Sequence, residues 1–536
     1  MTIILTGDDL TPADVVAVAR HGAAVSLGAV ARSEIIRVRD HIEQHWMGGD
    51  APPIYGFNTG VGKLKGYAIS PEDNRQFQIR LVLSHCGGLG DPAPVDVVRA
   101  MMLIRVNAFC QGVSGLRIAV VDRIVELLNK GVTPVVPVQG SVGASGDLAP
   151  LAHMVAAMIG LPQAECDYAG RRMAAPDALA AAGIAPVHFD LEAKDTLACV
   201  NGNALSAAIA TLNLHDAWQL VRMADITAAL SLEAVRGERA AFDERLHRVR
   251  KQPGQIDCAA NIRALVRGSE RTSDEARQVR LPHDLMNPEY KPRVQDVYSL
   301  RCAPQVHGAV RGNLTYCHDV LSREINAATD NPLVFWNSAG GLDPISGGNF
   351  HCEPIAFASD IATLSLTEMA NIAERRLFMI CDPSLSYGLP PMLAGEPAGL
   401  NSGFPVIACS AAAVTSEMRT LSFPASADNI PTKSSQEDHV SMATWAARKT
   451  ARVLPCLEKV LGIEYLIAAR AVFITADRLG RFRLGDGTTV AYDGLARQDV
   501  FTADDSYMPQ QSGAAVDAVA SRSLLRDVES RIGPLL

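Results

Sequence analysis

The spacing of apolar and polar residues divides the chain into a region of short elements and a region of long helices. Over roughly the first 200 residues, short apolar runs alternate with turn signals such as GGDAPP and KGVTPVVPVQG. Helical spacing appears there in stretches such as VVRAMMLIRVNAF and LRIAVVDRIVELLNK. Residues 163–195 combine alanine, proline and charge, which predicts loops with one short helix.

Beyond residue 200 the spacing is that of long helices. A stretch without proline runs from Asn203 to Gly237, and its apolar residues recur every three or four positions. These positions include Leu205, Ile209, Leu212, Leu220, Met223 and Leu230. Similar patterns cover residues 355–376 and 441–470, the latter with an expected kink at Pro455. Such lengths are about two to three times the globular mean and predict a mainly α fold, a bundle of long antiparallel helices.

We expect three parts along the chain. Residues 1–200 form a loop-rich N-terminal part, and residues 201–475 form the helix bundle. Residues 476–536 form a C-terminal excursion or tail, because residues 476–512 carry glycine, aspartate and polar turn residues. A length of 536 residues would by itself suggest several domains, but one long-helix architecture can absorb it.

Composition and charge narrow the class of protein. The net charge is −9 and no block of lysine or arginine is present, which argues against a nucleic-acid partner. No apolar run is long enough to span a membrane, and the N-terminus turns acidic within eight residues, unlike a signal peptide. We therefore expect a cytoplasmic protein.

The cysteines and histidines show no metal or disulfide pattern. Eleven cysteines are scattered singly, without a Cys-x-x-Cys pair, which indicates buried thiols. No His-Glu-x-x-His is present, and the groups of HCE at residues 351–353 lie too close in sequence for a helical metal face. We expect no metal site.

The glycine-rich run GSVGASGDLAPLAH, residues 140–153, carries the candidate chemistry. A Walker loop would end in Gly-Lys-Ser/Thr, whereas this run has Gly146 followed by Asp147, which would repel a phosphate. The glycines at 140, 143 and 146 also lack the G-x-G-x-x-G spacing of dinucleotide sites. The run is therefore not typical of phosphate binding.

A different reaction is open to Ala144, Ser145 and Gly146. If the backbone bends tightly, the amide nitrogen of Gly146 can attack the carbonyl carbon of Ala144, and glycine tolerates the torsions required. Loss of two waters, the second from Ser145, leaves an imidazolone with an exocyclic methylene, which is an electrophile. Asp147 is expected to cap the following helix, whose N-terminus would favour developing negative charge on the ring.

This run resembles the prosthetic-group segment of the histidine, phenylalanine and tyrosine ammonia-lyase family, in which Ala-Ser-Gly forms methylidene-imidazolone (MIO). The resemblance continues in the family's order through YGFNTGVGKL, LVLSHCGGLGDP, VNGNAL, VQDVYSLRCAPQVHG, DNPLVF, SGGNFHCEP and SSQEDHVSM. It spans residues 55–442 and is weaker beyond them. It implies MIO made from Ala144, Ser145 and Gly146, no external cofactor, and a homotetramer whose active sites each draw loops from three subunits.

The resemblance also implies roles for single residues. Tyr55 in YGFNTG matches the base that removes the β-proton of the substrate. Asn201 in VNGNAL matches the asparagine that donates a hydrogen bond to the imidazolone oxygen or the substrate carboxylate. Phe350 in GGNFH matches an aromatic residue of the pocket.

A second group of matches falls in one short segment. Arg301 in YSLRC matches the residue that pairs with the substrate carboxylate, a role suited to a planar bidentate donor. Tyr298 and Gln295 precede it by three and six positions, so that a helical segment would place all three on one face. In the family they contact the prosthetic group and the carboxylate.

Two positions indicate which amino acid is the substrate. His85 in LSHCGG resembles the selector of histidine- and tyrosine-specific members, and a polar selector rejects rings that lack its hydrogen-bonding partner. Glu437 in SSQEDHVSM matches histidine-specific members, and a carboxylate suits an imidazole N–H but is poorly satisfied by a bare phenyl ring. The preferred interpretation is elimination of ammonia from L-histidine to give urocanate.

Several departures keep alternatives open. Asn203 stands where the family has threonine, Val61 where it has phenylalanine, and Pro405 where histidine members have methionine. SLSYGLPP is closer to tyrosine-type members, and Lys433 could reach the pocket of Glu437 if that stretch were helical. The alternatives are a tyrosine ammonia-lyase, a tyrosine 2,3-aminomutase, a lyase of a modified histidine such as ergothioneine, and an inactive scaffold relative.

Overall fold

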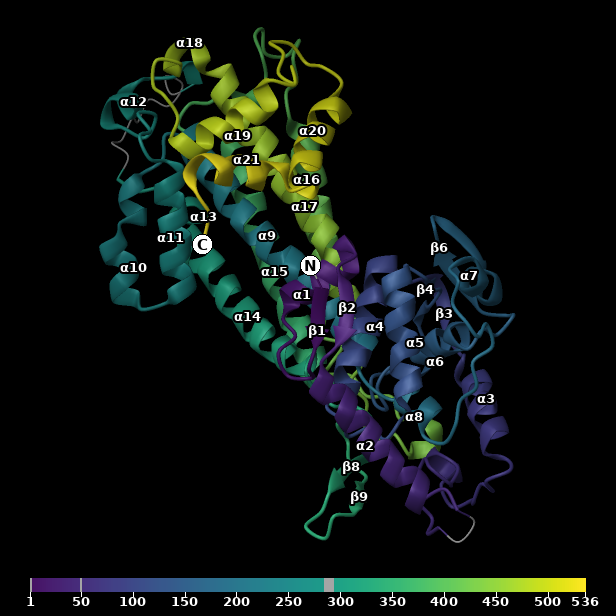
Figure 1. Cartoon of the computed structure of the whole chain (residues 1–536). Coiled ribbons are helices and arrows are strands. Elements are labelled where there is room, and N and C mark those ends of the chain that lie inside the picture. Colours follow the sequence, from purple (N-terminus) through teal and green to yellow (C-terminus); the bar gives the residue numbers. More distant parts are fainter. Residues whose placement is uncertain (1, 49–50, 284–293) are drawn as a thin grey trace. The chain divides into compact units, whose positions relative to one another are not determined.

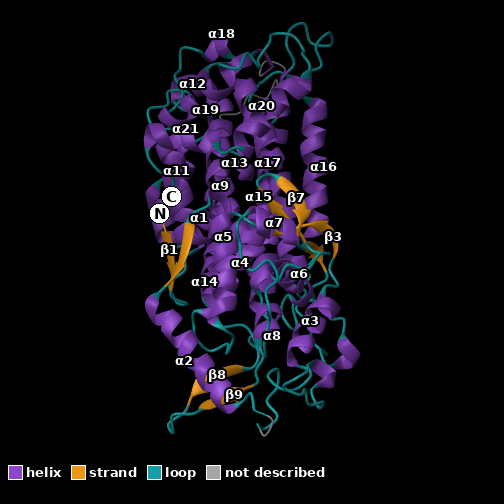
Figure 2. Ribbon diagram, turned by 45° about the vertical axis from the view of Figure 1, so that its right-hand side comes forward, coloured by secondary structure: helices purple, strands orange, loops and turns teal. Residues whose placement is uncertain are grey.

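The computed structural model describes residues 2–48, 51–283 and 294–536, and it confirms the mainly α fold (Figure 1). Figure 2 shows that helices dominate and that the strands are short. None of the helices within the described residues has the length and apolar character needed to cross a membrane.

The chain forms two compact units. The first contains residues 1–215, 317–360 and 424–450, and the second contains residues 216–316, 361–423 and 451–536. This division differs from the sequential one expected at residues 200 and 475, because the chain passes repeatedly from one unit to the other.

Long helices mark most of these passages. They are α9 (Ala204–Ala234), α14 (Ala303–Glu324), α15 (Glu353–Cys381) and α17 (Ala443–Ile474). Three correspond to the predicted long patterns, and α17 continues through Pro455 as one helix. The apolar positions predicted for α9 are all buried. Since buried residues occupy most positions of α9, its stability depends on tertiary packing on every side.

The rest of the first unit consists of shorter elements. Its helices are α1 (Pro12–His21), α2 (Ala29–His45), α3 (Asn74–His85), α4 (Val95–Phe109), α5 (Ile118–Lys130), α6 (Leu148–Met158), α7 (Ala175–Ala181) and α8 (Asp195–Val200), with 3-10 turns η1 (Gly62–Leu64) and η5 (Lys433–Ser435). Its strands are β1 (Thr2–Leu5), β2 (Ala24–Leu27), β3 (Leu89–Pro92), β4 (Thr133–Pro134), β5 (Pro137–Gln139), β6 (Glu165–Tyr168), β7 (Arg171–Ala174), β8 (Leu333–Trp336) and β9 (Leu342–Ile345).

These strands form small separate sheets. The parallel pair is β1 with β2, and the antiparallel groups are β3–β5, β4–β6–β7 and β8–β9. The hairpin of β6 and β7 lies where the sequence predicted loops and one helix. The pairing of β3 with β5, at Leu89 opposite Gln139, brings the chain after α3 alongside the start of the glycine-rich run.

The second unit is helical in its described part. Its other elements are η2 (Arg239–Phe242), α10 (Glu244–Arg250), α11 (Pro253–Leu265), α12 (Asp274–Gln278), α13 (Tyr298–Arg301), η4 (Pro391–Leu393), α16 (Pro405–Leu421), α18 (Ala476–Leu479), α19 (Asp486–Ala496), α20 (Met508–Ala520) and α21 (Ser523–Ile532). The expected C-terminal tail is instead part of this unit, because α19 packs against α21 and α11 (Figure 1). Leu495 of α19, Val528 of α21 and Leu265 of α11 are each fully buried, as this packing requires.

Candidate active site

The glycine-rich run forms a tight loop between β5 and α6. Gly146 has a φ of +68°, and a Cβ at this position would lie 2.1 Å from the carbonyl oxygen of Gly202. The two glycines face each other as a parallel bridge, and the amide of Asp147 donates to Gly202 O at 2.7 Å. Glycine is therefore required at 146 both for the torsion and for the close approach of two backbones.

Asp147 occupies the N-cap position of α6, but its side chain makes no capping hydrogen bond there. The buried carboxylate instead accepts hydrogen bonds from the Ser206 amide at 2.8 Å, and from the hydroxyls of Ser206 at 2.8 Å, Thr444 at 2.9 Å and Ser141 at 2.8 Å. Ser206 lies in the first turn of α9, so Asp147 satisfies that helix rather than its own. The predicted capping of α6 is thus corrected, and Asp147 anchors the loop to α9 and α17.

Ser145 has a defined partner on each of its oxygens. Asn201 Nδ2 donates to the carbonyl oxygen of Ser145 at 2.8 Å. The hydroxyl of Ser145 donates to Oε1 of Glu437. The structure therefore brings Asn201, Ser145 and Glu437 together.

Glu437 accepts further hydrogen bonds from Lys433 Nζ at 2.6 Å and Thr432 Oγ1 at 2.5 Å. Burial by itself would raise the pKa of Glu437, but the hydrogen bonds from Lys433, Ser145 and Thr432 together lower it. The carboxylate is therefore held ionised next to Ser145.

An unusual backbone delivers Lys433 and Glu437. Lys433, Ser434 and Ser435 have φ values of +49°, +53° and +60°, in the left-handed region that such residues rarely adopt. The amide of Thr432 donates to Glu437 O at 2.9 Å and closes the loop. Lys433 does reach Glu437, although through this left-handed turn and not through the α-helix on which the prediction depended. Strain of this kind is typical of functional sites.

His85 ends α3, and its ring is largely out of water. Its Nδ1 lies 2.9 Å from Leu81 O, an arrangement in which Nδ1–H donates and Nε2 is left as an acceptor. Burial lowers the pKa of His85 and the nearby charge of Lys433 lowers it further, against the effect of the Leu81 carbonyl. His85 is therefore a neutral imidazole close to Lys433.

Tyr55 and Phe350 lie in the same unit. The phenolic oxygen of Tyr55 accepts a hydrogen bond from the Gly62 amide at 3.1 Å, and η1, which begins at Gly62, contacts η5. Half-buried Phe350 precedes Cys352, whose amide donates to Gly143 O at 3.0 Å. The loop of Tyr55 thus contacts the turn η5, which carries Lys433. The loop of Phe350 is hydrogen-bonded to the Ser145 loop through Cys352 and Gly143.

Gln295, Tyr298 and Arg301 belong to the second unit. Tyr298 is 70% exposed, and the Arg301 guanidinium lies over its ring at 4.4 Å from the centroid. The helix α13 begins only at Tyr298, so exposed Gln295 lies before it and not on the predicted common face. Arg301 Nε is buried without a hydrogen-bond partner among the described residues.

Comparison with known proteins identifies the family. The sequence profile of aromatic amino acid lyases matches residues 10–497. The chain belongs to the aromatic amino acid lyase family. A histidine ammonia-lyase of Caldanaerobacter subterraneus subsp. tengcongensis is 44% identical to this lyase over 498 residues, covering 93% of this chain and 92% of that protein.

Solved structures agree with this membership. The tyrosine aminomutase of Streptomyces globisporus has a TM-score of 0.90 to this lyase at 34% identity, covering 99% of each chain. A histidine ammonia-lyase from Trypanosoma cruzi has a TM-score of 0.86 at 32% identity, covering 99% of this chain and 95% of that one.

One departure of this lyase from the family pattern forms a polar pair that the sequence did not reveal. Asn203 Nδ2 donates to Oε2 of Glu324, while Asn203 Oδ1 is buried without a partner in the described part of the chain. Burial raises the pKa of Glu324 to about 7, although Asn203 and Arg323 act in the opposite direction. Pro405, another departure, is the first residue of α16, a position where proline is favoured.

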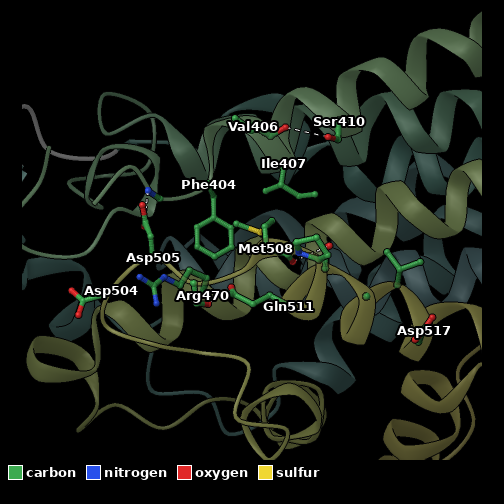
Figure 3. Close-up of a pocket in the computed structure, with 16 residues that line it drawn as sticks. Phe404, Val406, Ile407, Ser410, Arg470, Asp504, Asp505, Met508, Gln511 and Asp517 are labelled. Carbon is green, nitrogen blue, oxygen red and sulfur yellow. Dashed lines mark hydrogen bonds between the residues drawn. The ribbon is translucent and has the colours of Figure 1, made fainter. Parts of the chain in front are cut away.

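The second unit of the lyase contains a cavity of about 570 Å³ (Figure 3). It lies between α16, α17 and α20, and Phe404, Met508 and Arg470 contribute to its wall. Asp505 at its edge accepts hydrogen bonds from the amides of Ser402 at 2.6 Å and Gly403 at 3.0 Å, so this carboxylate serves to hold the loop before α16. The residues that line the cavity include none of those predicted for the site.

Proposed function

We propose that the protein eliminates ammonia from L-histidine to give urocanate, using MIO formed from Ala144, Ser145 and Gly146. Two kinds of observation support this proposal. Its relatives include histidine ammonia-lyases with 44% identity over nearly the full chain. The observation that carries it is the ionised Glu437 held against the Ser145 hydroxyl, because that carboxylate suits an imidazole N–H.

The residues of the loop fit the proposed ring. The amide of Gly146 must approach the carbonyl carbon of Ala144, and the positive φ of Gly146 suits that bend. The carbonyl of Ser145 would become the ring carbonyl, and Asn201 already donates to it at 2.8 Å. When formed, the ring supplies an electrophilic carbon that no ordinary side chain offers.

Glu437 and His85 are proposed to recognise the imidazole ring of the substrate. Oε1 of Glu437 accepts from both Ser145 and Lys433, and dehydration of Ser145 removes one of these donors. The oxygen then has a lone pair free for an imidazole N–H. The free Nε2 of neutral His85 is an alternative acceptor for that N–H.

Tyr55 is proposed to remove the β-proton. Its phenolic oxygen is held by the Gly62 amide, which fixes its position relative to η1. Gln295, Tyr298 and Arg301 are proposed to bind the substrate carboxylate of a site in another subunit of a homotetramer. The exposure of Tyr298 and the unsatisfied Nε of Arg301 among the described residues support this role. The cysteines are all free, which fits the proposed cytoplasmic location.

A tyrosine aminomutase is the second candidate. The high structural similarity to the Streptomyces globisporus tyrosine aminomutase favours it, since aminomutation uses the same electrophile and differs in whether the amine adds back. A lyase of a modified imidazole such as ergothioneine remains an outcome of the same test.

The test is a substrate panel with a matched variant. Histidine, tyrosine, phenylalanine and ergothioneine are each offered to the protein, and the conjugated acid is followed by its ultraviolet absorbance. We expect histidine to give the highest kcat/KM. Ser145→Ala should lose the near-ultraviolet absorbance of the ring and nearly all turnover. Activity in Ser145→Ala would refute the mechanism, β-tyrosine formation would favour the aminomutase, and no turnover of any substrate would favour a scaffold.

A further inference from the structure

Three potential metal ligands meet beside the Ser145 loop, although the spacing of HCE along the sequence predicted no metal site. They are His351, Glu353 and His439, and one ligand atom from each lies within 4.8 Å of the others. His351 and Glu353 flank the start of α15, and His439 follows Glu437 by two residues. The imidazole rings lie with centroids 5.4 Å apart.

The spacing of the two imidazoles suits a tetrahedral cation. Nε2 of His351 and Nδ1 of His439 are 3.4 Å apart. Zinc–nitrogen bonds of about 2.0–2.1 Å at a tetrahedral angle place two ligand nitrogens about 3.3–3.4 Å apart. The separation of the two nitrogens therefore already matches that of two ligands of one ion.

Glu353 supplies the remaining charge. Its Oε2 is buried without a hydrogen-bond partner in the described part of the structure, and it lies 3.9 Å from Nδ1 of His351, beyond hydrogen-bonding distance. A hydrogen bond between the two histidines alone would leave this oxygen unsatisfied, which is costly for a carboxylate. A cation would satisfy it, and exposed His439 is free to adjust its ring toward the ion.

A second ligand group within the described residues lacks these properties. Asp225, Cys258 and His307 are buried together. However, Asp225 is paired with Arg311, and Arg376 Nη1 lies 3.3 Å from Nε2 of His307. Arg311 already neutralises that carboxylate, and the guanidinium of Arg376 beside His307 would repel a further cation.

We propose that His351, Glu353 and His439 bind one divalent transition-metal cation of the zinc class. Two imidazoles and one carboxylate are a ligand set that zinc accepts, with the fourth position left to water. Gly143 O accepts hydrogen bonds from Cys352 N at 3.0 Å and from Ser441 Oγ at 3.0 Å, so the ligands come from two segments already joined at the Ser145 loop. The ion links these segments and fixes the chain that carries Glu437.

The experiment uses the full chain, stripped of metal and titrated with Co²⁺. Stoichiometry is measured by equilibrium dialysis and geometry by the visible absorption of tetrahedral cobalt. His41 and His45 stack on exposed turns of α2, with centroids 4.1 Å apart, and could bind Co²⁺ adventitiously. All measurements are therefore made in a His45→Asn background. This background is also the matched control, because it loses a histidine outside the proposed site and should still bind the ion.

We expect one Co²⁺ per chain in that background, with the tetrahedral spectrum. Adding His439→Asn or Glu353→Gln should weaken binding about tenfold or more. Adding Ser145→Ala should leave binding unchanged, which separates this proposal from the proposed function. Absence of bound Co²⁺ in the His45→Asn background, or equal affinity with and without His439→Asn, would overturn the assignment.

Discussion

Replacement of Glu437 by glutamine tests the basis of substrate choice with the least change in shape. The side chain of Glu437 is 9% exposed, and its carboxylate accepts hydrogen bonds from Lys433 and Thr432 besides that from Ser145. Glutamine retains one oxygen that accepts hydrogen bonds but loses the negative charge. Its NH2 group takes the place of the other carboxylate oxygen and cannot accept the hydrogen bonds made to that oxygen in Glu437. Lys433, whose side chain is 43% exposed, can turn to water.

The magnitude follows from the hydrogen bond that the substrate would lose. A hydrogen bond to a charged group contributes about 1.5–3 kcal/mol net, and one between neutral groups about 0.5–1.5 kcal/mol. The difference is about 1–1.5 kcal/mol, which corresponds to a five- to tenfold change in kcat/KM at about 1.4 kcal/mol per decade. Tyrosine has no imidazole N–H, so its smaller kcat/KM should change little.

The assay measures kcat/KM for histidine and for tyrosine on each variant. Near-ultraviolet absorbance is recorded first, so that only protein containing the ring is compared. The matched control is Asp438→Asn, which makes the same chemical change at an exposed neighbour and should leave both substrates unaffected. Equal losses for histidine and tyrosine, or an unchanged histidine value, would show that Glu437 does not recognise the imidazole.

Three further outcomes are expected. Gly146→Ala should abolish the near-ultraviolet absorbance, because its Cβ would lie 2.1 Å from Gly202 O. The control Gly170→Ala, at φ +76° in open space, should keep the absorbance and lower the free energy of unfolding by about 1 kcal/mol in a melting experiment. The pKa of Glu324 is raised from 4.5 to about 7, so between these values the folded chain keeps a proton that the unfolded chain releases. The free energy of unfolding should therefore fall by up to about 3 kcal/mol as pH rises from about 5 to 7. A Tm difference between the wild type and Glu324→Gln that is constant with pH would contradict this. Arg301→Lys should raise KM for histidine about tenfold with a smaller change in kcat, since lysine cannot form a bidentate pair, and steady-state kinetics with unchanged KM would exclude the role.

The local spacing of apolar residues was sufficient to predict the long helices of the protein. Period and length predicted the helix from Ala204 to Ala234 and two other long helices, because three- and four-residue spacing of apolar side chains has few structural solutions. The identity and order of Ala144, Ser145 and Gly146, and the resemblance around them, pointed to the chemistry before any fold was known. The proposed ring forms from three consecutive residues, so the sequence alone can indicate this reactivity.

Tertiary structure alone determined which polar groups meet. Asp147 satisfies α9 instead of α6, and Glu324 is paired with Asn203, because burial leaves each group only the partners that packing supplies. Lys433 reaches Glu437 through three left-handed residues that no propensity predicts, and His351 meets His439 across 88 positions of sequence. Such contacts depend on the path of the whole backbone, since the energy that holds a strained turn or a buried carboxylate in place comes from packing distant in sequence.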